Sequence, residues 1–466
     1  MLFTSYTFLF YFLPVVLLLF YVSPERARLP ILLFSSYVFY GFWRMDCLAL
    51  LIASTIVGYF AALRVGQSCE KRSRHFWLLI GVGINLGILF YFKYTVFFAK
   101  TYNTIVGNNS SLEVFIPEII LPVGVSFFVF QVVSYIVDVY REDVTPARSF
   151  LRFSTYVCMF PQLVAGPIVR YKDVEEQIET HSLRRSQIEA GVKLFMAGFI
   201  KKVLIANNIA SLSDLAFSLK SPSFLQSFFG TLSYTFQIYF DFCGYTDMAI
   251  GLGLMLGFRF IKNFNCPYHS TSITDFWRRW HISMSTFFRD YLYISLGGNR
   301  GNFVRTLLNL VVTMLLAGLW HGAGWTFVLW GLAHGLFLAA ERICKQFTVL
   351  RFVQRLPRVA RKIITFIVIA STWIIFRADN WDSALSMYSG FVVMDFKVGL
   401  QWLEENTEAF FWMIFASASI YTILEKSLTQ KTNFPRLRSA LLLTLFLISI
   451  HELFGQAYNP FLYFQF

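Results

Sequence analysis

The sequence contains few charged residues and no long polar stretch. Asp, Glu, Lys and Arg make up 14% of the 466 residues, whereas hydrophobic residues make up 56%. Soluble domains have a larger charged share and a smaller apolar share, so a soluble protein is excluded. Apolar runs of roughly 18 or more residues recur along the chain, and each is long enough to cross a bilayer as a helix. The sequence predicts an all-α polytopic membrane protein with about ten to twelve spanning or re-entrant helices. We expect one membrane domain over residues 1–466 and no soluble domain.

Several catalytic and metal-binding signatures are missing. The six cysteines are scattered without a Cys-x-x-Cys pair, which argues against a disulfide framework and a zinc site. There is no Gly-x-Ser-x-Gly motif, and His451-Glu452 lacks the second histidine of a zinc-protease helix. The histidine of soluble glycerolipid acyltransferases, with an aspartate five residues later, is also absent. We expect no bound metal and no bound cofactor.

Positive charge is in excess, with 40 Lys and Arg against 27 Asp and Glu. The excess lies in short segments between apolar runs, as in residues 342–362. Such segments are typical of cytoplasmic loops that meet anionic lipid. Nucleic-acid binding is not expected, because no basic stretch forms a separate folded face.

Hydropathy places the expected helices along the chain. They are expected at about 1–22, 29–63 as a hairpin broken near 43–46, 76–98, 114–139, 187–216, 224–260, 307–319, 324–340, 363–376, 410–424 and 441–453. Residues 151–169 are apolar but contain Pro161 and Gly166-Pro167, which indicates a re-entrant element. Lys93 and Asp138 are expected near helix ends, where charged side chains can reach the interface. The aromatic tail NPFLYFQF suits a membrane–water boundary.

Two glycine patterns resemble dinucleotide fingerprints, Gly81-x-Gly83-x-x-x-Gly87 and Gly251-x-Gly253-x-x-x-Gly257. Neither follows a predicted strand, so close approach of membrane helices is the better interpretation.

Residues 271–296 differ from the apolar runs because aromatic and charged side chains alternate there. An amphipathic helix at the interface, or one lining an aqueous funnel, is predicted. Residues 297–301 then form a glycine-rich turn, which lacks the Gly-Lys-Ser/Thr ending of a phosphate loop.

The strongest catalytic candidate is His321, within Gly318-Leu319-Trp320-His321-Gly322. It lies in the apolar passage 311–340, whose only other ionisable side chain is His334. Ionisable groups inside a membrane are costly and are functional candidates by default. Histidine can act as a general base near neutral pH, and Trp320 could exclude water. The alternative is a histidine bonded across a helix interface.

A second cluster is Trp277-Arg278-Arg279-Trp280-His281. Arginines beside tryptophans form an anion site that suits a phosphate-bearing donor. The alternative is an interfacial anchor in which Asp275 pairs with Arg279 one turn later.

A third cluster is the segment 239–247, with Asp241, Tyr245 and Asp247 in an apolar run. Six residues apart is not one face of a helix, so the two aspartates are not a carboxylate dyad by spacing. One could orient a histidine or bind Arg278; the alternative is a structural ion pair.

Longer segments resemble a known family, the membrane-bound O-acyltransferases (MBOAT), and within it the alginate O-acetylation membrane-subunit type. The segments are LPVGVSFFVFQVVSYIVDVYR, MFPQLVAGPIVRYKD, FDFCGYTDMAIGLGLMLGFRF, NFNCPYHSTSITDFWRRWHISMSTFFRDYLYISLGGNRG, LAGLWHGAGWTFVLWGLAHG and PFLYFQF. The resemblance covers nearly the whole chain, with a core at about 225–345. The family usually has serine where this chain has Cys243 and Thr246, so we expect altered local hydrogen bonding and retained activity.

The resemblance implies a ring of helices around a central funnel and tunnel in a bacterial inner membrane. It implies that His321 matches the family's essential histidine and His281 its second histidine. The expected reaction moves acetyl from cytoplasmic acetyl-coenzyme A to an exopolysaccharide hydroxyl, with Arg278 and Arg279 near the donor phosphates. Peptidoglycan as acceptor, a carrier-protein thioester as donor, an acyl-histidine intermediate, a transporter and a scaffold stay open. Expected partners are periplasmic or single-span acetyltransferases, the polysaccharide synthase machinery and the lipid bilayer.

Overall fold

A computed structural model describes residues 1–107, 112–347, 355–422 and 435–455, and over these residues it contains helices and connecting loops but no strand. The described chain divides into two compact units. The first consists of residues 1–192 and 249–261, and the second of residues 193–248 and 262–466. The predicted tail 459–466, the end of the predicted helix 410–424 and part of the basic segment 342–362 lie outside the described residues.

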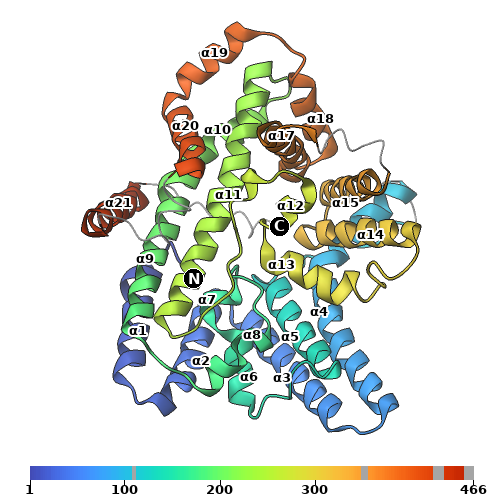
Figure 1. Cartoon of the computed structure of the whole chain (residues 1–466), viewed down its shortest axis with the longest axis vertical. Helices are drawn as coiled ribbons and strands as arrows, with labels where there is room; N and C mark the ends of the chain where they lie inside the picture. The colour runs from blue at the N-terminus through green and yellow to red at the C-terminus, as the bar shows by residue number, and fades with distance from the viewer. Residues whose placement is uncertain (108–111, 348–354, 423–434, 456–466) are drawn as a thin grey trace. The chain divides into compact units, whose positions relative to one another are not determined.

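The first unit is built from the amino-terminal helices (Figure 1). They are η1 Thr7–Phe12, α1 Leu13–Val22, α2 Glu25–Gly41, α3 Met45–Gln67, α4 Lys71–Val106, α5 Val125–Tyr140, α6 Phe150–Cys158, α7 Phe160–Leu163 and α8 Tyr171–Glu179. Helix α9, Arg185–Ile200, begins in this unit. The hairpin of α2 and α3 confirms the prediction for residues 29–63, and the interruption after α6 confirms that 151–169 is not one continuous helix, while its re-entrant or interfacial character stays a prediction.

The second unit carries the remaining elements. They are η2 Lys201–Ala206, α10 Asn207–Ser218, α11 Phe224–Met255, which ends in the first unit, η3 Pro267–His269, α12 Ile273–Trp277, α13 Ile282–Phe287, η4 Phe288–Tyr293, α14 Phe303–His321, α15 Trp325–Gln346, α17 Arg358–Arg377, α18 Trp381–Gly390, α19 Phe396–Glu405, α20 Thr407–Thr422 and α21 Pro435–Gly455.

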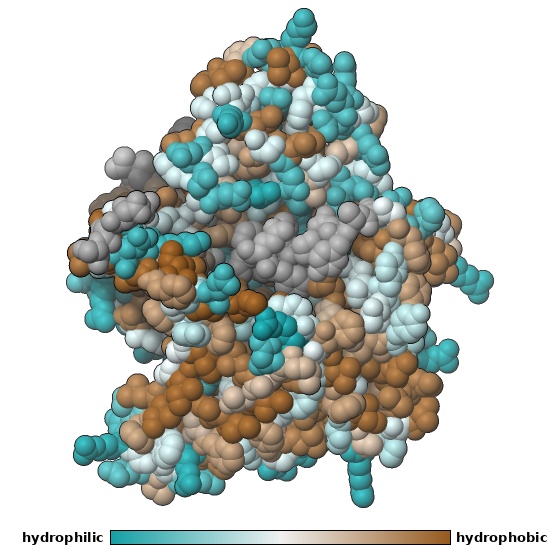
Figure 2. Space-filling view, turned by 180° about the vertical axis from the view of Figure 1, so that it is seen from behind, coloured by the Kyte–Doolittle hydropathy of each residue, from teal (hydrophilic) through white to brown (hydrophobic). Residues whose placement is uncertain are grey.

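Five helices in the described part of the chain are long and apolar enough to cross a membrane: α3, α4, α14, α15 and α17. Residues 7–22, 125–140 and 439–455 form shorter apolar helices. Figure 2 shows broad areas of hydrophobic side chains on the surface. The prediction of an all-α polytopic membrane protein is confirmed.

Two local predictions in the first unit are wrong, and a third is confirmed only in part. The helix predicted at 114–139 begins only at Val125, because Pro122 and the left-handed Gly124 (φ 75°) precede it. Lys93 lies inside α4 and is 8% exposed, so it is not at a helix end. A Cβ added at Gly81 would lie 2.5 Å from that of Ala61. A Cβ added at residue 83 or 87 would have no other atom within 4 Å. Only the first glycine of that pattern therefore mediates close packing.

The single amphipathic helix predicted at 271–296 is also wrong. The segment forms α12, α13 and η4, interrupted at His281, whose backbone is left-handed (φ 43°, ψ 55°). A non-glycine residue in this conformation ends the preceding helix and redirects the chain. The turn predicted at 297–301 is confirmed, with positive φ at Gly297 and Gly298.

Helices η2 and α11 are joined by buried ion pairs. Lys201 Nζ lies 2.6 Å from Asp247 Oδ2, and the adjacent Lys202 pairs with Asp241. Both pairs form where the backbones of α9 and α11 approach closely at Gly198 and Gly244. A Cβ added at Gly198 would lie only 2.4 Å from the carbonyl oxygen of Gly244. The structural alternative for the two aspartates is thus present, and a role in substrate binding stays a prediction.

Candidate functional site

Two buried histidines from different elements lie close together in the second unit. His321 is the last residue of α14 and His281 precedes α13. Their exposed fractions are 3% and 0%, and their ring centroids are 6.3 Å apart. The fold therefore places beside each other the two histidines predicted from the sequence.

Hydrogen bonds define the tautomer of His281. Asn263 Oδ1 accepts from the backbone N–H of Ser283 at 3.1 Å and from its hydroxyl at 2.9 Å. Because a backbone N–H can only donate, the amide oxygen of Asn263 must face this side. His281 Nδ1 lies 3.2 Å from the same oxygen and must carry its proton. Burial lowers the pKa of His281, which lies outside the spanning helices, so the ring is neutral with its lone pair on Nε2.

Aromatic rings enclose His321. The indole of Trp320 lies 5.0 Å away between ring centroids, that of Trp330 5.2 Å and the ring of Phe376 5.3 Å. Trp330 and Phe376 come from α15 and α17, so three helices define this environment. Such an enclosure excludes bulk water and strengthens polar interactions inside it.

Glycines bring α14 and α15 into antiparallel contact (Figure 1). A Cβ at Gly318 would lie 2.3 Å from the carbonyl oxygen of Phe327, and one at Gly331 would lie 2.4 Å from that of Met314. A Cβ at Gly322 would meet the Phe327 ring at 2.2 Å. The glycines around His321 thus permit close packing of the two helices.

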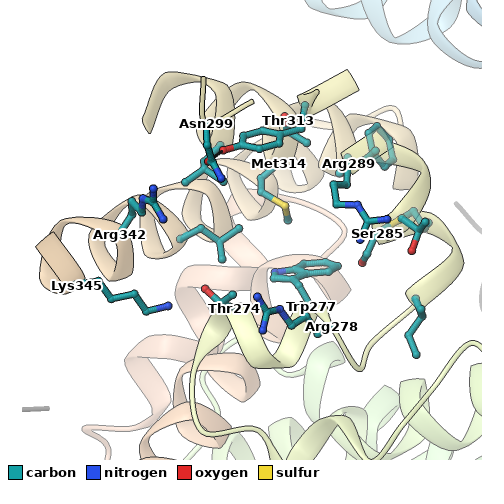
Figure 3. A pocket seen from close by; sticks show the side chains of 18 residues that line it. Thr274, Trp277, Arg278, Ser285, Arg289, Asn299, Thr313, Met314, Arg342 and Lys345 are labelled. Carbon is teal, nitrogen blue, oxygen red and sulfur yellow. Dashed lines mark hydrogen bonds between the residues drawn. The ribbon is translucent and has the colours of Figure 1, made fainter. Parts of the chain in front are cut away.

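A cavity of about 480 Å³ lies between α12, α13, η4, α14 and α15. Its wall is mostly apolar, with the Trp277 indole on one side and Met314 on the other (Figure 3). Four basic side chains also line it, and in Figure 3 they come from three parts of the chain. They are Arg278 after α12, Arg289 in η4, and Arg342 and Lys345 near the end of α15.

Most of these cations are not neutralised by the protein. In the part of the chain that is described, no carboxylate lies within ion-pair distance of Arg278, Arg342 or Lys345. Arg279 differs, because its Nε lies 2.8 Å from Asp275 Oδ1. The structure therefore brings Arg278 to the cavity and gives Arg279 the predicted one-turn partner. An apolar cavity with uncompensated cations suits an organic anion.

Neither histidine lines the cavity, but residues next to both of them do. Ala317, which lines it, is one helical turn before His321 on the same face of α14. Ile282, also in the lining, directly follows His281. A ligand bound along α14 would thus extend from the basic side chains toward both imidazoles.

The other predicted residues occupy three positions. Trp277 lines the cavity. Trp280 is fully buried and packs on Trp373 at 5.0 Å between centroids. Trp320 packs against both histidines. The third group is on α11 and consists of Asp241, Tyr245 and Asp247.

Sequence reasoning missed four kinds of contribution. It interpreted residues 342–362 only as a topological signal, and so missed Arg342 and Lys345. It noted His334 as an ionisable residue in an apolar passage but assigned it no role. It gave no weight to Asn263, although that residue begins a segment resembling the family. It named Arg289 only as part of the charged pattern at 271–296.

The model of the MBOAT, membrane-bound O-acyltransferase family, matches residues 73–378, which include the whole site. The chain belongs to this family. It is 42% identical to the probable alginate O-acetylase AlgI of Azotobacter vinelandii over the full length of both chains. Identity to the protein of the same name in Pseudomonas aeruginosa is 47% over 83% of this chain and 74% of the relative. It is 37% identical to the peptidoglycan O-acetyltransferase of Helicobacter pylori over 92% of this chain and 87% of the relative.

This membership confirms several predictions. The chain is an O-acyltransferase of the membrane-bound family and a multi-pass membrane protein. An enzyme of this class transfers an acyl group to a hydroxyl, which excludes the transporter and scaffold alternatives as the main function.

Proposed function

We propose that this O-acyltransferase moves acetyl from cytoplasmic acetyl-coenzyme A across the inner membrane to a hydroxyl of an exopolysaccharide of the alginate or cellulose type. The observation that carries the proposal is the pair of buried histidines next to residues that line a cation-lined apolar cavity. The names of the relatives support acetyl as the group transferred. Peptidoglycan is the second candidate acceptor, on the basis of the Helicobacter relative.

In the proposed reaction His321 is the general base. The acceptor hydroxyl oxygen attacks the thioester carbonyl carbon as His321 takes the hydroxyl proton. The tetrahedral oxyanion collapses, the carbon–sulfur bond breaks, and the proton passes from His321 to the departing sulfur. The products are an O-acetyl ester and a free thiol. Because His321 ends α14, the partial negative charge of the helix carboxyl terminus stabilises the transient imidazolium.

His281 positions the acceptor in this proposal. Its Nδ1 proton is engaged by Asn263, so the ring presents Nε2 as an acceptor nitrogen. A neutral imidazole of this tautomer can accept a hydrogen bond from a hydroxyl but cannot donate one to an oxyanion. The reacting hydroxyl has a single proton, which His321 takes, so His281 Nε2 accepts instead from a second hydroxyl of the acceptor sugar and holds the acceptor in place.

The number of basic side chains favours coenzyme A over a carrier protein. Coenzyme A carries a diphosphate and a ribose phosphate, whereas the prosthetic arm of a carrier has a single phosphodiester. Arg278, Arg342 and Lys345 match the larger anionic charge, whereas Arg289 pairs with Asp290.

Delivery to the polymer is proposed to require partners. Periplasmic or single-span acetyltransferases next to the polysaccharide synthase machinery receive the acetyl group and deliver it to the polymer; direct transfer by this chain is the alternative. In this proposal the donor is cytoplasmic and the acceptor extracytoplasmic, so the acetyl group must cross the bilayer.

The proposal is tested in proteoliposomes of known orientation. Labelled acetyl-coenzyme A is supplied on one face, with alginate, cellulose or peptidoglycan fragments and the candidate partners on the other. We expect labelled polysaccharide ester only when the donor is on the cytoplasmic face. Ester formed only from an acetylated carrier protein would exclude coenzyme A, and ester formed only on peptidoglycan would select the second candidate.

A further inference from the structure

A third buried histidine, His334 on α15, forms a hydrogen-bonded chain next to the cavity. It is fully buried, and its Nδ1 lies 3.3 Å from the indole Nε1 of Trp277. Its Nε2 lies 3.1 Å from the hydroxyl of Thr372 on α17. Three separate elements, α12, α15 and α17, are thereby linked through one imidazole.

The direction of each hydrogen bond follows from the groups involved. An indole N–H can only donate, so His334 Nδ1 accepts from Trp277. The Thr372 hydroxyl donates to the carbonyl oxygen of Ile369 at 2.7 Å, so it accepts from His334 Nε2–H. The chain thus requires a neutral imidazole with its proton on Nε2.

The indole held by His334 is part of the cavity wall. Trp277 lines the cavity, and the same helix α12 precedes Arg278, the first of the basic side chains. Glu341 on α15 accepts hydrogen bonds from the backbone N–H of Thr274 at 3.1 Å and from its hydroxyl at 2.6 Å. Helix α12 is therefore attached to α15 at its first turn by Glu341 and at its last residue by His334.

His334 also lies near the proposed catalytic base, His321, because one tryptophan ring packs on both histidines. Its ring packs on Trp330 at 4.7 Å between centroids, and Trp330 packs on His321 at 5.2 Å. No hydrogen bond is involved in this second contact, so the direct effect of His334 falls on Trp277.

We propose that His334 is a positioning residue for the acyl donor, which holds the Trp277 indole as a fixed wall of the cavity through a defined imidazole tautomer. The inference rests on the proposed function, because the cavity is taken as the donor site. His334 itself touches neither donor nor acceptor.

Two substitutions separate the two hydrogen bonds of His334. His334→Asn keeps an acceptor oxygen near the position of Nδ1, whereas His334→Gln keeps a donor near that of Nε2 but loses the acceptor for Trp277. We expect His334→Gln to raise the KM for acetyl-coenzyme A about fivefold with little change in kcat, the effect of one hydrogen bond. His334→Asn should stay within about twofold of wild type, as should the matched control Thr372→Ser, which keeps the hydroxyl.

A double-substitution cycle tests whether the effect passes through Trp277. In a Trp277→Phe background, which has no indole N–H, the Asn and Gln variants should have the same KM. Equal effects of Asn and Gln in the wild-type background, or a Gln effect that persists undiminished beside Trp277→Phe, would overturn the proposal.

A second measurement needs no donor. The indole N–H signal of Trp277 is recorded by NMR on protein labelled with ¹⁵N-tryptophan and assigned by its loss in Trp277→Phe. We expect slow deuterium exchange of this proton in wild type and His334→Asn and fast exchange in His334→Gln. Unchanged exchange in a folded Gln variant would overturn the proposal. If wild type does not use acetyl-coenzyme A, the donor assignment fails while the indole result still tests the bond.

Discussion

The rings of His281 and His321 lie 6.3 Å apart between centroids, inclined by 59°. At this distance two neighbouring hydroxyl groups of one acceptor sugar can each reach a nitrogen of one ring, since hydrogen bonds span about 2.7–3.0 Å. The two rings reach this position by different routes. His321 ends a membrane helix, whereas His281 occupies a left-handed break between two short helices. Their roles in the proposed reaction differ correspondingly, one as the base and the other as the group that orients the acceptor.

Replacing the proposed base should remove the chemical step and leave donor binding intact. We expect His321→Ala to lower kcat by about 10²–10⁴, the usual contribution of a general base. Transfer of labelled acetyl and equilibrium binding of coenzyme A are measured on the same preparations. The matched control is His451→Ala, because His451 is exposed on α21. Wild-type kcat in His321→Ala would remove this residue from the chemistry.

Asn263 should control the protonation state of His281. Asn263→Asp keeps an acceptor oxygen but adds a negative charge, which raises the pKa of the neighbouring imidazole. In wild type, burial lowers that pKa, so His281 is neutral through the physiological range. In the variant His281 becomes protonated at a higher pH than in wild type, and its Nε2 can then no longer accept a hydrogen bond from the acceptor. We expect the acid limb of the kcat profile to move to higher pH; an unmoved limb would contradict the acceptor role of Nε2.

The basic side chains of the cavity should contribute to donor binding through charge. Arg278→Gln, Arg342→Gln and Lys345→Gln should each raise the KM for acetyl-coenzyme A about two- to fivefold, as expected for exposed charge pairs. The effects should shrink at high salt. Arg279→Gln is the matched control, because Arg279 pairs with Asp275. An equal or larger effect at Arg279 would place the phosphates elsewhere.

The buried ion pair of Lys202 and Asp241 should matter for folding. Both side chains are at most 3% exposed. Removing only the lysine leaves a buried carboxylate without this partner, so Lys202→Met should destabilise by about 3–5 kcal/mol. Adding Asp241→Leu should recover most of the loss. Thermal unfolding in detergent measures the change, with exposed Lys193→Met as the control. If the double variant is no more stable than the single one, the pair is not the cause.

Close packing of α14 on α15 should not tolerate a methyl group at Gly318. The new Cβ would lie 2.3 Å from the carbonyl oxygen of Phe327, a backbone atom that cannot rotate away. We expect Gly318→Ala to destabilise by about 1–3 kcal/mol and to lower kcat by displacing His321. At Gly324 the nearest atom to an added Cβ is 3.5 Å away, so Gly324→Ala should have wild-type stability and activity. Equal behaviour of the two variants would argue against the helix contact.

Much of the fold could be predicted because hydropathy is a local property of the sequence. The spans at α3, α4, α14, α15 and α17 follow from apolar length, since backbone groups in lipid must be paired within a helix. The turn at 297–301 follows from its glycines. The break at His281 could not be predicted in this way, because the backbone N–H groups of Ile282 and Ser283 donate to Asn263, which is far away in the sequence.

The sequence by itself determined the membrane class, the family and the two candidate histidines, because each depends on composition or on contiguous segments. Only the tertiary structure decided which charges are neutralised and which are available. It pairs Arg279 with Asp275 and Lys202 with Asp241, while Arg278 lines the cavity with Arg342. It also connects His334 to Trp277. The physical reason is that hydrogen bonds and ion pairs act over a few ångströms in space, whatever the separation along the chain.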